Sequence, residues 1–349
     1  MQLSIDERYM FRCLELARLG LGSTAPNPMV GAVLVHEDRI IGEGYHQRCG
    51  GPHAEVNCLD NVQPEDRHLI PASTLYVSLE PCAHHGRTPP CAARIIREGI
   101  REVVVAIRDP FPLVDGKGIE LMEAAGIRVR LGMMGKEAEW LNQRFLTFHT
   151  KGRPYIILKW ARSADGMIAG PGPSRISISG QATRALVHQW RYQEAAIMVG
   201  AGTVEVDDPR LTVRPSPSPR QPVRIILDPR LRLHTGHRVF DPEGPVVICN
   251  VLKEGTEGHL RYLRLPPTED LLPGMLQRLH DLGIQSVFVE GGRKLLEAFL
   301  KADAWDEIRR ITARDKRIPG GYPEPAWAGM QPLRRDFIEQ DMIETFIHG

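Results

Sequence analysis

Hydrophobic positions in the first 150 residues recur at helical spacing in some stretches and at strand spacing in others. An apolar stripe predicts an amphipathic helix over residues 5–20, which the prolines at positions 26 and 28 end. Strands are predicted at 30–36, 39–43, 75–79, 103–107 and 127–131, and helices at 53–60, 91–99, 117–126 and 136–150. This alternation of helices and strands indicates a layered α/β domain.

A second alternating series follows the Lys-Gly-Arg-Pro segment at 151–154, which we take as a domain boundary. Strands are predicted at 155–160, 195–199, 223–227, 246–249, 287–290 and 308–313, and helices near 180–193, 269–282 and 292–301. The proline-rich segment 215–222 is expected to be a loop, and the chain from about residue 314 has no clear pattern. We therefore expect two α/β domains, residues 1–150 and 151–349.

Composition narrows the class of protein. The 349 residues carry 44 basic and 43 acidic side chains, so no overall field attracts nucleic acid. The chain opens without a long apolar run, so neither a signal peptide nor a membrane span is expected. Six scattered cysteines do not make a disulfide framework, and a reducing cytoplasm suits them best.

Four residues carry the candidate chemistry of the first domain. His53 and Glu55 form a His-x-Glu pattern, and Cys82 and Cys91 each follow a proline. One imidazole and two thiolates leave the fourth tetrahedral position of a zinc ion open, as in catalytic zinc sites. This order of residues is typical of zinc-dependent base deaminases, in which the glutamate is the acid/base and not a ligand. The alternative is that both cysteines are small core side chains.

The eight residues between these cysteines separate them more widely than the common Cys-x-x-Cys spacing. They read Ala-His-His-Gly-Arg-Thr-Pro-Pro and so offer several hydrogen-bond donors and one permanent cation. The insert therefore restricts the choice of substrate more than the zinc motif does.

The second domain has no Gly-x-Gly-x-x-Gly segment, so a Rossmann dinucleotide site has no support. Glu290-Gly291-Gly292 joins a predicted strand to a predicted helix, where glycines let a phosphate approach backbone N–H groups. The alternative is that these glycines serve turn geometry only. Thr203 and the Asp207-Asp208 pair form a second cluster, which is equally consistent with a simple turn.

Together these motifs resemble the bifunctional deaminase–reductases of bacterial riboflavin biosynthesis, over residues 1–305. The matching segments are Pro26-Asn27-Pro28, Gly42 to His46, His53 to Glu55, the Pro81-Cys82 to Cys91 insert, Lys159, Ser163 to Gly166, Gly202 to Pro209, Leu211 to Arg214 and Glu290 to Gly292. Two adjacent domains match in the order that the family has.

The resemblance implies a cytidine-deaminase-like three-layer α/β/α domain that acts on 2,5-diamino-6-ribosylamino-4(3H)-pyrimidinone 5′-phosphate. One zinc ion per chain would lower the pKa of its bound water, and Glu55 would move the protons. Asn27, His46 and His84 match positions that hold the substrate in this family. Arg87 is a candidate for the substrate phosphate, with a solvated loop arginine as the alternative.

For the second domain the resemblance implies a dihydrofolate-reductase-like fold that reduces the ribosyl group of 5-amino-6-(5-phosphoribosylamino)uracil to ribityl with NADPH. The positions that match substrate contacts are Ser174, Arg191, Arg214 and Glu290, with Lys159 as a possible proton donor or a salt-bridged strand residue. The positions that match cofactor contacts are Ala161, Ile176, Thr203, Asp207, Leu211, Gly292, Arg293, Lys294 and Leu295.

Three departures from the family pattern fall in the second domain. Ile176 stands where many relatives have an aromatic residue, Pro229 replaces a common serine, and Arg293 replaces a common proline. Residues 315–321 also differ from the family pattern. These changes leave open the preference between NADPH and NADH.

Three other functions remain open at this stage. The first domain could deaminate a base in tRNA, although the neutral charge balance opposes this. The second domain could be a non-catalytic scaffold, or the zinc could be structural. Homo-oligomerisation, as a dimer or tetramer, is implied by the resemblance alone, and the expected partners are small phosphorylated pyrimidines, with neither nucleic acid nor membrane.

Overall fold

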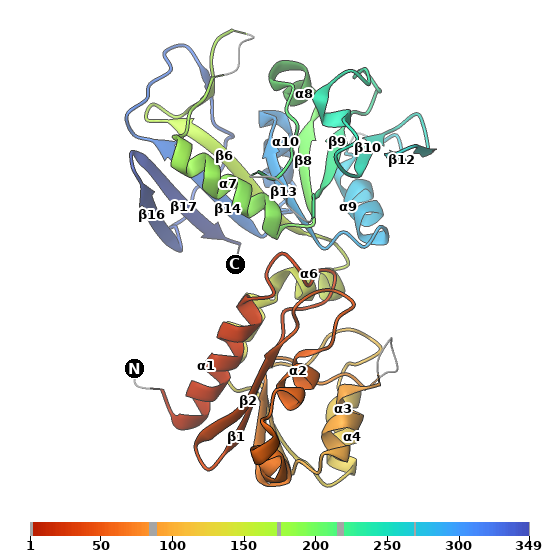
Figure 1. Ribbon diagram of the computed structural model, residues 1–349. Helices are drawn as coiled ribbons and strands as arrows, with labels where there is room; N and C mark the ends of the chain where they lie inside the picture. Colours follow the sequence, from red (N-terminus) through yellow and green to blue (C-terminus); the bar gives the residue numbers. More distant parts are fainter. Residues whose placement is uncertain (1–2, 84–88, 173–175, 215–219, 269, 349) are drawn as a thin grey trace. The chain divides into compact units, whose positions relative to one another are not determined.

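The computed structural model describes residues 3–83, 89–172, 176–214, 220–268 and 270–348 (Figure 1). The chain divides into two compact units, Met1–Lys151 (unit 1) and Gly152–Gly349 (unit 2). Each unit is built around its own sheet.

Unit 1 is built on a five-stranded sheet in the order β2-β1-β3-β4-β5. The strands are β1 (Gly31–His36), β2 (Arg39–Tyr45), β3 (Thr74–Val77), β4 (Glu102–Val105) and β5 (Arg128–Leu131). β1 runs antiparallel to β2 and β3, whereas β3, β4 and β5 are parallel. The helices are α1 (Ile5–Arg18), α2 (Ala54–Asp60), the 3-10 helix η1 (Pro64–Ala72), α3 (Cys91–Arg97), α4 (Lys117–Ala124), α5 (Gly135–Leu141) and α6 (Gln143–Lys151).

Side chains that alternate along β3 show how unit 1 is layered. Leu75 packs in a core with Cys58 of α2 and Ile95 of α3. Its neighbour Tyr76 faces the opposite side and packs in a second core with Met10 of α1. Helices therefore cover both faces of the sheet, as Figure 1 shows for α1 on one face and α2 and α3 on the other. The expected three-layer α/β/α domain is confirmed.

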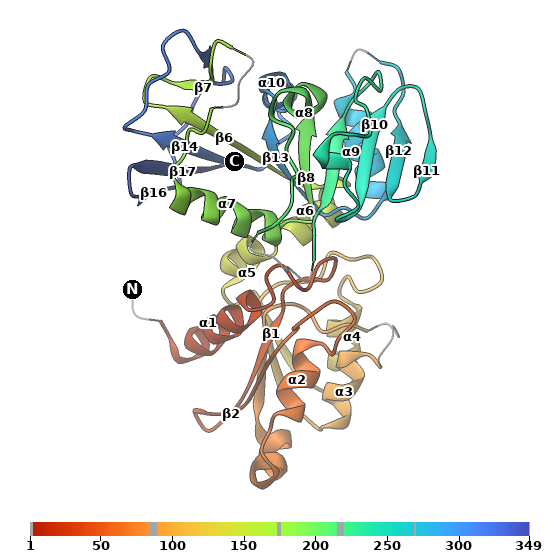
Figure 2. The same ribbon diagram turned by 45° about the horizontal axis from the view of Figure 1, so that its top comes forward.

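Unit 2 is built on a ten-stranded sheet in the order β11-β12-β10-β9-β8-β13-β6-β14-β17-β16. The strands are β6 (Tyr155–Ser163), β8 (Ala196–Gly200), β9 (Val223–Leu227), β10 (Val246–Asn250), β11 (Gly255–Glu257), β12 (Leu260–Arg264), β13 (Ser286–Gly291), β14 (Glu307–Ala313), β16 (Arg334–Ile338) and β17 (Asp341–Ile347). The run from β12 to β14 is parallel, and antiparallel strands close both edges (Figure 2). A separate pair joins β7 (Met167–Ala169) to β15 (Tyr322–Pro323).

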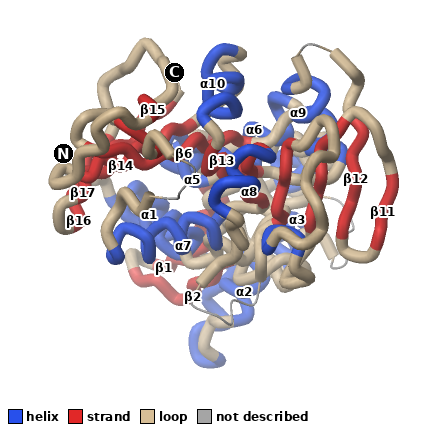
Figure 3. The backbone as a smooth tube through the Cα atoms, turned by 90° about the horizontal axis from the view of Figure 1, so that it is seen from above, coloured by secondary structure: helices blue, strands red, loops and turns tan. Residues whose placement is uncertain are grey.

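Helices cover both faces of this second sheet. The helices are α7 (Gln181–Gln193), α8 (Ala201–Asp207), the 3-10 helix η2 (Arg238–Phe240), α9 (Leu272–Asp281) and α10 (Arg293–Lys301). Leu276 of α9 and Phe299 of α10 share one core with Val287 of β13, whereas Val187 of α7 packs with Phe288. Figure 3 accordingly shows α10 and α7 on opposite sides of the β6–β13 region. The expected α/β architecture of the second domain is thus confirmed.

One predicted helix differs from the structure, and a segment without a predicted element forms strands. A single helix was expected over 136–150, but the structure has two helices, α5 and α6. They are separated at Asn142, the C-cap residue of α5, because its side-chain amide hydrogen-bonds to the backbone of Met29. Asn142 accepts from Met29 N and donates to Met29 O, both at 2.9 Å. The segment after residue 314, which had no clear pattern, adds the antiparallel strands β16 and β17 to the sheet.

The packing of α1 against β1 depends on Gly31. A Cβ atom at this position would lie 2.0 Å from Cys13 O and 2.9 Å from Ala17 N, both on the backbone of α1. We predict that Gly31→Ala lowers the free energy of unfolding by about 2 kcal/mol or more, because the helix must move. Urea unfolding followed by circular dichroism measures this. Gly135→Ala is the matched control, since its nearest contact would be an ordinary 3.4 Å, and equal stability of both variants would contradict the prediction.

Candidate active sites

Unit 1 brings one histidine and two cysteines together at the N-termini of two helices. His53 is the N-cap residue of α2, in an extended backbone conformation, and Cys91 is the first residue of α3. Cys82 lies in the loop after β3, and it is joined to α3 through a hydrogen bond from Ala92 N to Cys82 O of 3.2 Å. The free N–H groups and dipoles of helix N-termini favour thiolate over thiol at such a place.

The distances among these side chains fit a zinc ion. His53 Nδ1 lies 3.6 Å from Cys82 Sγ and 3.3 Å from Cys91 Sγ, and the three ligand atoms all lie within 4.8 Å of one another. Ligands at tetrahedral angles, with Zn–N near 2.0 Å and Zn–S near 2.3 Å, are separated by about 3.6 Å. The hydrogen bond with Cys91 lowers the pKa of Cys82 and so favours its thiolate form, whereas the same contact raises the pKa of Cys91. The residues present therefore match the donor set and the spacing that zinc requires.

Glu55 lies beside this cluster, in the first turn of α2. Its side chain is buried, and burial raises the pKa of Glu55 to about 7, while the nearby His53 opposes the rise. A carboxyl group with a pKa near the working pH can both accept and donate a proton. The geometry therefore suits an acid/base, and the three atoms that could bind the ion come from other residues.

Glu80, which motif analysis did not single out, fixes the loop that carries Cys82. Its buried carboxylate caps the N-terminus of α4, whose own N-cap residue, Gly116, has no side chain. The donors are the backbone N–H groups of Asp109, Gly116, Gly118 and Ile119, at 3.2, 3.0, 3.0 and 3.3 Å. Glu80 directly precedes the Pro-Cys pair in the sequence, and this position was a signal for a role at the site. A carboxylate next to a motif is normally exposed to solvent, however, so its burial was not expected.

Asn27 and His46 lie together as a pair. His46 Nδ1 lies 2.9 Å from the Pro52 carbonyl and must donate to it, so Nε2 is left to accept from Asn27 Nδ2 at 3.0 Å. Burial lowers the pKa of His46, which keeps the ring neutral. Both ring nitrogens of His46 are thus engaged within the protein, and the ring fixes the position of the Asn27 amide.

Three predicted site residues lie outside the described part of the chain. They are His84 and Arg87, in the insert between the two cysteines, and Ser174, before Ile176. Their predicted roles rest on the sequence alone.

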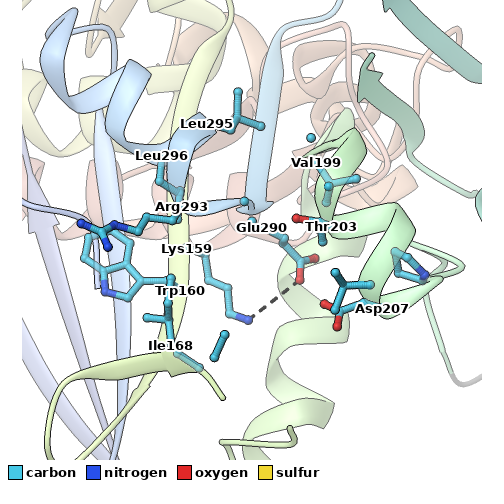
Figure 4. Close-up of a pocket in the computed structure, with 18 of the residues that line it drawn as sticks. Lys159, Trp160, Ile168, Val199, Thr203, Asp207, Glu290, Arg293, Leu295 and Leu296 are labelled. Carbon is cyan, nitrogen blue, oxygen red and sulfur yellow. Dashed lines mark ion pairs between the residues drawn. The ribbon is translucent and has the colours of Figure 1, made fainter. Parts of the chain in front are cut away.

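Unit 2 contains a cavity of about 1120 Å³ at the carboxyl ends of its central strands (Figure 4). The expected substrate residues that line it are Lys159, Arg191, Arg214 and Glu290. The expected cofactor residues that line it are Ala161, Ile176, Thr203, Asp207, Leu211, Gly292, Arg293, Lys294 and Leu295. Residues spread over more than 130 positions of the sequence therefore meet in one place, as expected where parallel strands end at a common edge.

A cluster of charges lies on one wall of this cavity. Arg191 Nη2 donates to Glu290 at 2.9 Å, and a second guanidinium nitrogen pairs with the other carboxylate oxygen. Lys159 Nζ lies 3.9 Å from Glu290, and Figure 4 shows the two side chains pointing toward one another. Burial tends to raise the pKa of Glu290, but Arg191 and Lys159 outweigh it and hold the pKa below its ordinary value. The Glu290 carboxylate is therefore ionised and lies between two basic side chains.

The glycine turn after β13 lies on the same cavity. Gly292 has φ +85°, a conformation that favours glycine, and α10 begins directly after it. A Cβ atom on Gly292 would lie 3.3 Å from Thr203 Oγ1 of α8. Because Gly292 has no side chain, this turn can lie close to α8. It stands beside the N-terminus of α10, where an anionic group is favoured.

The cavity also contains residues that motif analysis missed. Arg184 and His188 stand at helical spacing with the predicted Arg191 on α7, and all three line the cavity, which is a polar stripe that the sequence could have revealed. Tyr322 lines the cavity from β15, in the segment that had no clear pattern. Nothing in its sequence neighbourhood indicates that placement.

Fold and site together define a class: a zinc-binding deaminase domain joined to a reductase domain. Residues 3–107 match the family described as the cytidine and deoxycytidylate deaminase zinc-binding region, and residues 154–313 match the RibD C-terminal domain. The chain belongs to the RibD family of bifunctional deaminase–reductases of riboflavin biosynthesis.

Individual relatives support this assignment over both domains. Riboflavin biosynthesis protein RibD of Aquifex aeolicus is 44% identical over 310 residues, which are 87% of this chain and 85% of that protein. RibD of Escherichia coli is 41% identical over 321 residues, 87% of this chain and 86% of that protein. Among solved structures, the deaminase/reductase of Thermotoga maritima superposes with a TM-score of 0.87 at 35% identity over 98% of both chains, and Acinetobacter baumannii RibD with 0.88 at 34% over 99% of both.

A helix that crosses a bilayer must be both long and apolar, and the described helices can be judged by these two properties. None of them is long and apolar enough to cross a membrane.

The Glu80 carboxylate leads to a test of how the metal cluster is positioned. We predict that Glu80→Gln lowers stability by about 2 kcal/mol and reduces the zinc content of purified enzyme, because an amide replaces one of two acceptor oxygens beside four N–H donors. Urea unfolding and metal analysis measure the two effects. Glu120→Gln, at an exposed position on α4, is the matched control. Zinc content equal to that of the control would contradict the positioning role.

Proposed function

We propose that unit 1 deaminates 2,5-diamino-6-ribosylamino-4(3H)-pyrimidinone 5′-phosphate, and that unit 2 then reduces the ribosyl group of 5-amino-6-(5-phosphoribosylamino)uracil to ribityl with NADPH. The observation that carries the proposal is the cluster of His53, Cys82 and Cys91 beside the buried Glu55. The similarity to the Thermotoga maritima deaminase/reductase supports the choice of substrates.

His53, Cys82 and Cys91 hold one zinc ion per chain in this proposal. When bound there, the ion lowers the pKa of a water molecule toward neutrality and so supplies the nucleophile. Glu55 accepts the proton from that water and returns it to the ring nitrogen and the departing ammonia. The pKa of Glu55, raised by burial to about 7, suits both transfers.

Asn27 contacts the pyrimidine substrate in this proposal, and His46 acts through Asn27. The support is the hydrogen bond of 3.0 Å between the two side chains, together with the burial of His46. His84 and Arg87 complete the substrate site from the insert between the cysteines, with Arg87 as the cation for the phosphate. These two roles rest on the resemblance and on residue chemistry.

Lys159 and Glu290 form the reacting end of the cavity in unit 2. Lys159 donates a proton to the sugar oxygen as the ring opens, and Glu290 and Arg191 fix its position and its charge. Because Arg191 is already paired with Glu290, the substrate phosphate falls mainly to Arg214 and Ser174. Arg191 contributes only the part of its positive potential that Glu290 does not cancel.

NADPH supplies the hydride and spans the rest of the cavity in this proposal. The helix N-terminus after Gly292 receives the pyrophosphate, and Thr203, Asp207, Arg293, Lys294 and Leu295 surround it, with Ala161, Ile176 and Leu211 along the walls. Arg232 lines the cavity beyond β9 and is half exposed, 3.3 Å from Glu205. A permanent cation at this end favours the additional phosphate of NADPH over NADH.

The thiols of the chain suit a reducing compartment, and we place the protein in the cytoplasm on that basis. All six cysteines are free, and two of them serve as metal ligands in this proposal. The family resemblance adds the expectation of a homo-oligomer, which sedimentation of the purified enzyme measures.

Replacing Glu55 tests the deaminase proposal. We predict that Glu55→Gln keeps the bound zinc but lowers ammonia release at least about 10²-fold, because the amide cannot carry protons. NADPH oxidation with the deaminated pyrimidine supplied directly stays at the wild-type rate. Glu65→Gln, exposed on η1, is the matched control. Wild-type ammonia release by Glu55→Gln would show that the carboxyl is not the acid/base.

Replacing Lys159 tests the reductase proposal. We predict that Lys159→Met lowers kcat for reduction about 10²-fold while ammonia release is unchanged, because methionine keeps the aliphatic stem but has no proton to donate. Stopped-flow absorbance of NADPH measures the reduction step. Lys301→Met, exposed at the end of α10, is the matched control. A kcat within threefold of the control would reduce Lys159 to an ion-pair partner of Glu290.

A further inference from the structure

Two apolar side chains are exposed at one end of the cavity in unit 2. Tyr322 of β15 is 56% exposed and Ile176 is 42% exposed, and both line the cavity. Tyr322 pairs in register with Ala169 of β7, and the Ile176 side chain lies over the next residue, Gly170. The two side chains therefore share one corner of the wall, and a bound group with an apolar surface would cover them.

The segment that carries Tyr322 is anchored on both sides of it. Asp165 accepts from Ile318 N through both carboxylate oxygens, at 3.1 Å each, and Lys316 Nζ donates to Ile178 O at 2.6 Å. On the other side, Glu324 N donates to Gly166 O at 2.9 Å.

Side chains tie the same segment to the sheet and leave the tyrosine ring outside that packing. The Glu324 carboxylate accepts from Trp160 Nε1 at 2.8 Å, and Ile318 is buried. Within the described chain the Tyr322 hydroxyl has no hydrogen-bond partner. Tyr322 is thus a flat ring held on a fixed strand, with its surface left for a ligand rather than used in the core.

The order of strands indicates which part of the ligand lies at this corner. The sheet runs β9-β8-β13-β6, and the cavity follows it from Arg232 after β9, past the glycine turn after β13, to Lys159 on β6. A dinucleotide with its pyrophosphate at the glycine turn has one ring on each side. The ring that reacts must lie on the side of Lys159 and Glu290, which is also the side of β7 and β15.

We propose that Tyr322 stacks on the nicotinamide ring of NADPH and sets its position in the reductase site, with Ile176 completing the apolar wall. This inference rests on the proposal that unit 2 binds NADPH. It assigns a specificity-determining residue to the segment 314–333, which crosses from β14 to β16.

The test uses full-length enzyme with Tyr322→Ala, Tyr322→Leu and Tyr322→Phe. NADPH affinity is measured by fluorescence titration, and the KM of the deaminated pyrimidine is measured separately at saturating NADPH. Loss of the stacking ring in the alanine variant is expected to raise the Kd of NADPH roughly two- to twelve-fold. Tyr322→Leu shows a smaller rise and Tyr322→Phe stays within twofold of wild type, and thermal unfolding of the full-length enzyme followed by circular dichroism confirms that unit 2 of each variant is folded.

Phe337→Ala is the matched control, because Phe337 is equally exposed at 56% but lies on β16, away from the cavity. A rise confined to the KM of the pyrimidine would overturn the assignment and place the ring on the substrate. An unchanged Kd in Tyr322→Ala would also overturn it. Absence of NADPH binding by the wild-type enzyme is a different result, since it would contradict the underlying reductase proposal.

Discussion

The convergence of His53, Cys82 and Cys91 on one point is the constraint on which unit 1 depends. Two of these residues stand at the N-termini of α2 and α3, and the third stands in the loop after β3, so the sheet and both helices must keep fixed relative positions for the three side chains to meet. The Glu80 carboxylate supports that arrangement by capping α4 beside Cys82. The fold of unit 1 is in this sense the scaffold of a metal site, with Glu55 buried beside it.

Unit 2 also positions its candidate site with strands and the helices that follow them, but the residues at this site are different. Its parallel strands end at one edge, where Lys159, Glu290 and the glycine turn meet, and there no metal cluster is found among the described residues. The charged side chains at this edge are paired, because Arg191 and Lys159 both face the Glu290 carboxylate. In the proposed reactions, unit 1 activates water and unit 2 orients a sugar and a cofactor.

Local patterns predicted the fold well where apolar spacing was regular, as in the strands around Leu75 and Val287. They failed at Asn142, because the bond of its amide to Met29 is set by tertiary structure. The candidate ligands His53, Cys82 and Cys91 could be picked out from the sequence because metal chemistry requires particular side chains in a particular order, and the structure brings them together. Glu80 and Tyr322 were not, since a capping carboxylate and a cavity-lining tyrosine resemble ordinary surface residues until the chain is folded. The pairing of Arg191 with Glu290 likewise appears only across 99 positions of sequence.

Removal of zinc by chelation distinguishes the two chemistries that we propose for this chain. Ammonia release from the diaminopyrimidine phosphate and NADPH oxidation with the deaminated pyrimidine are measured separately, before and after removal of zinc. We expect ammonia release to stop on chelation and to return when zinc is restored, while NADPH oxidation continues throughout. Loss of both activities on chelation, or of neither, would contradict this expectation.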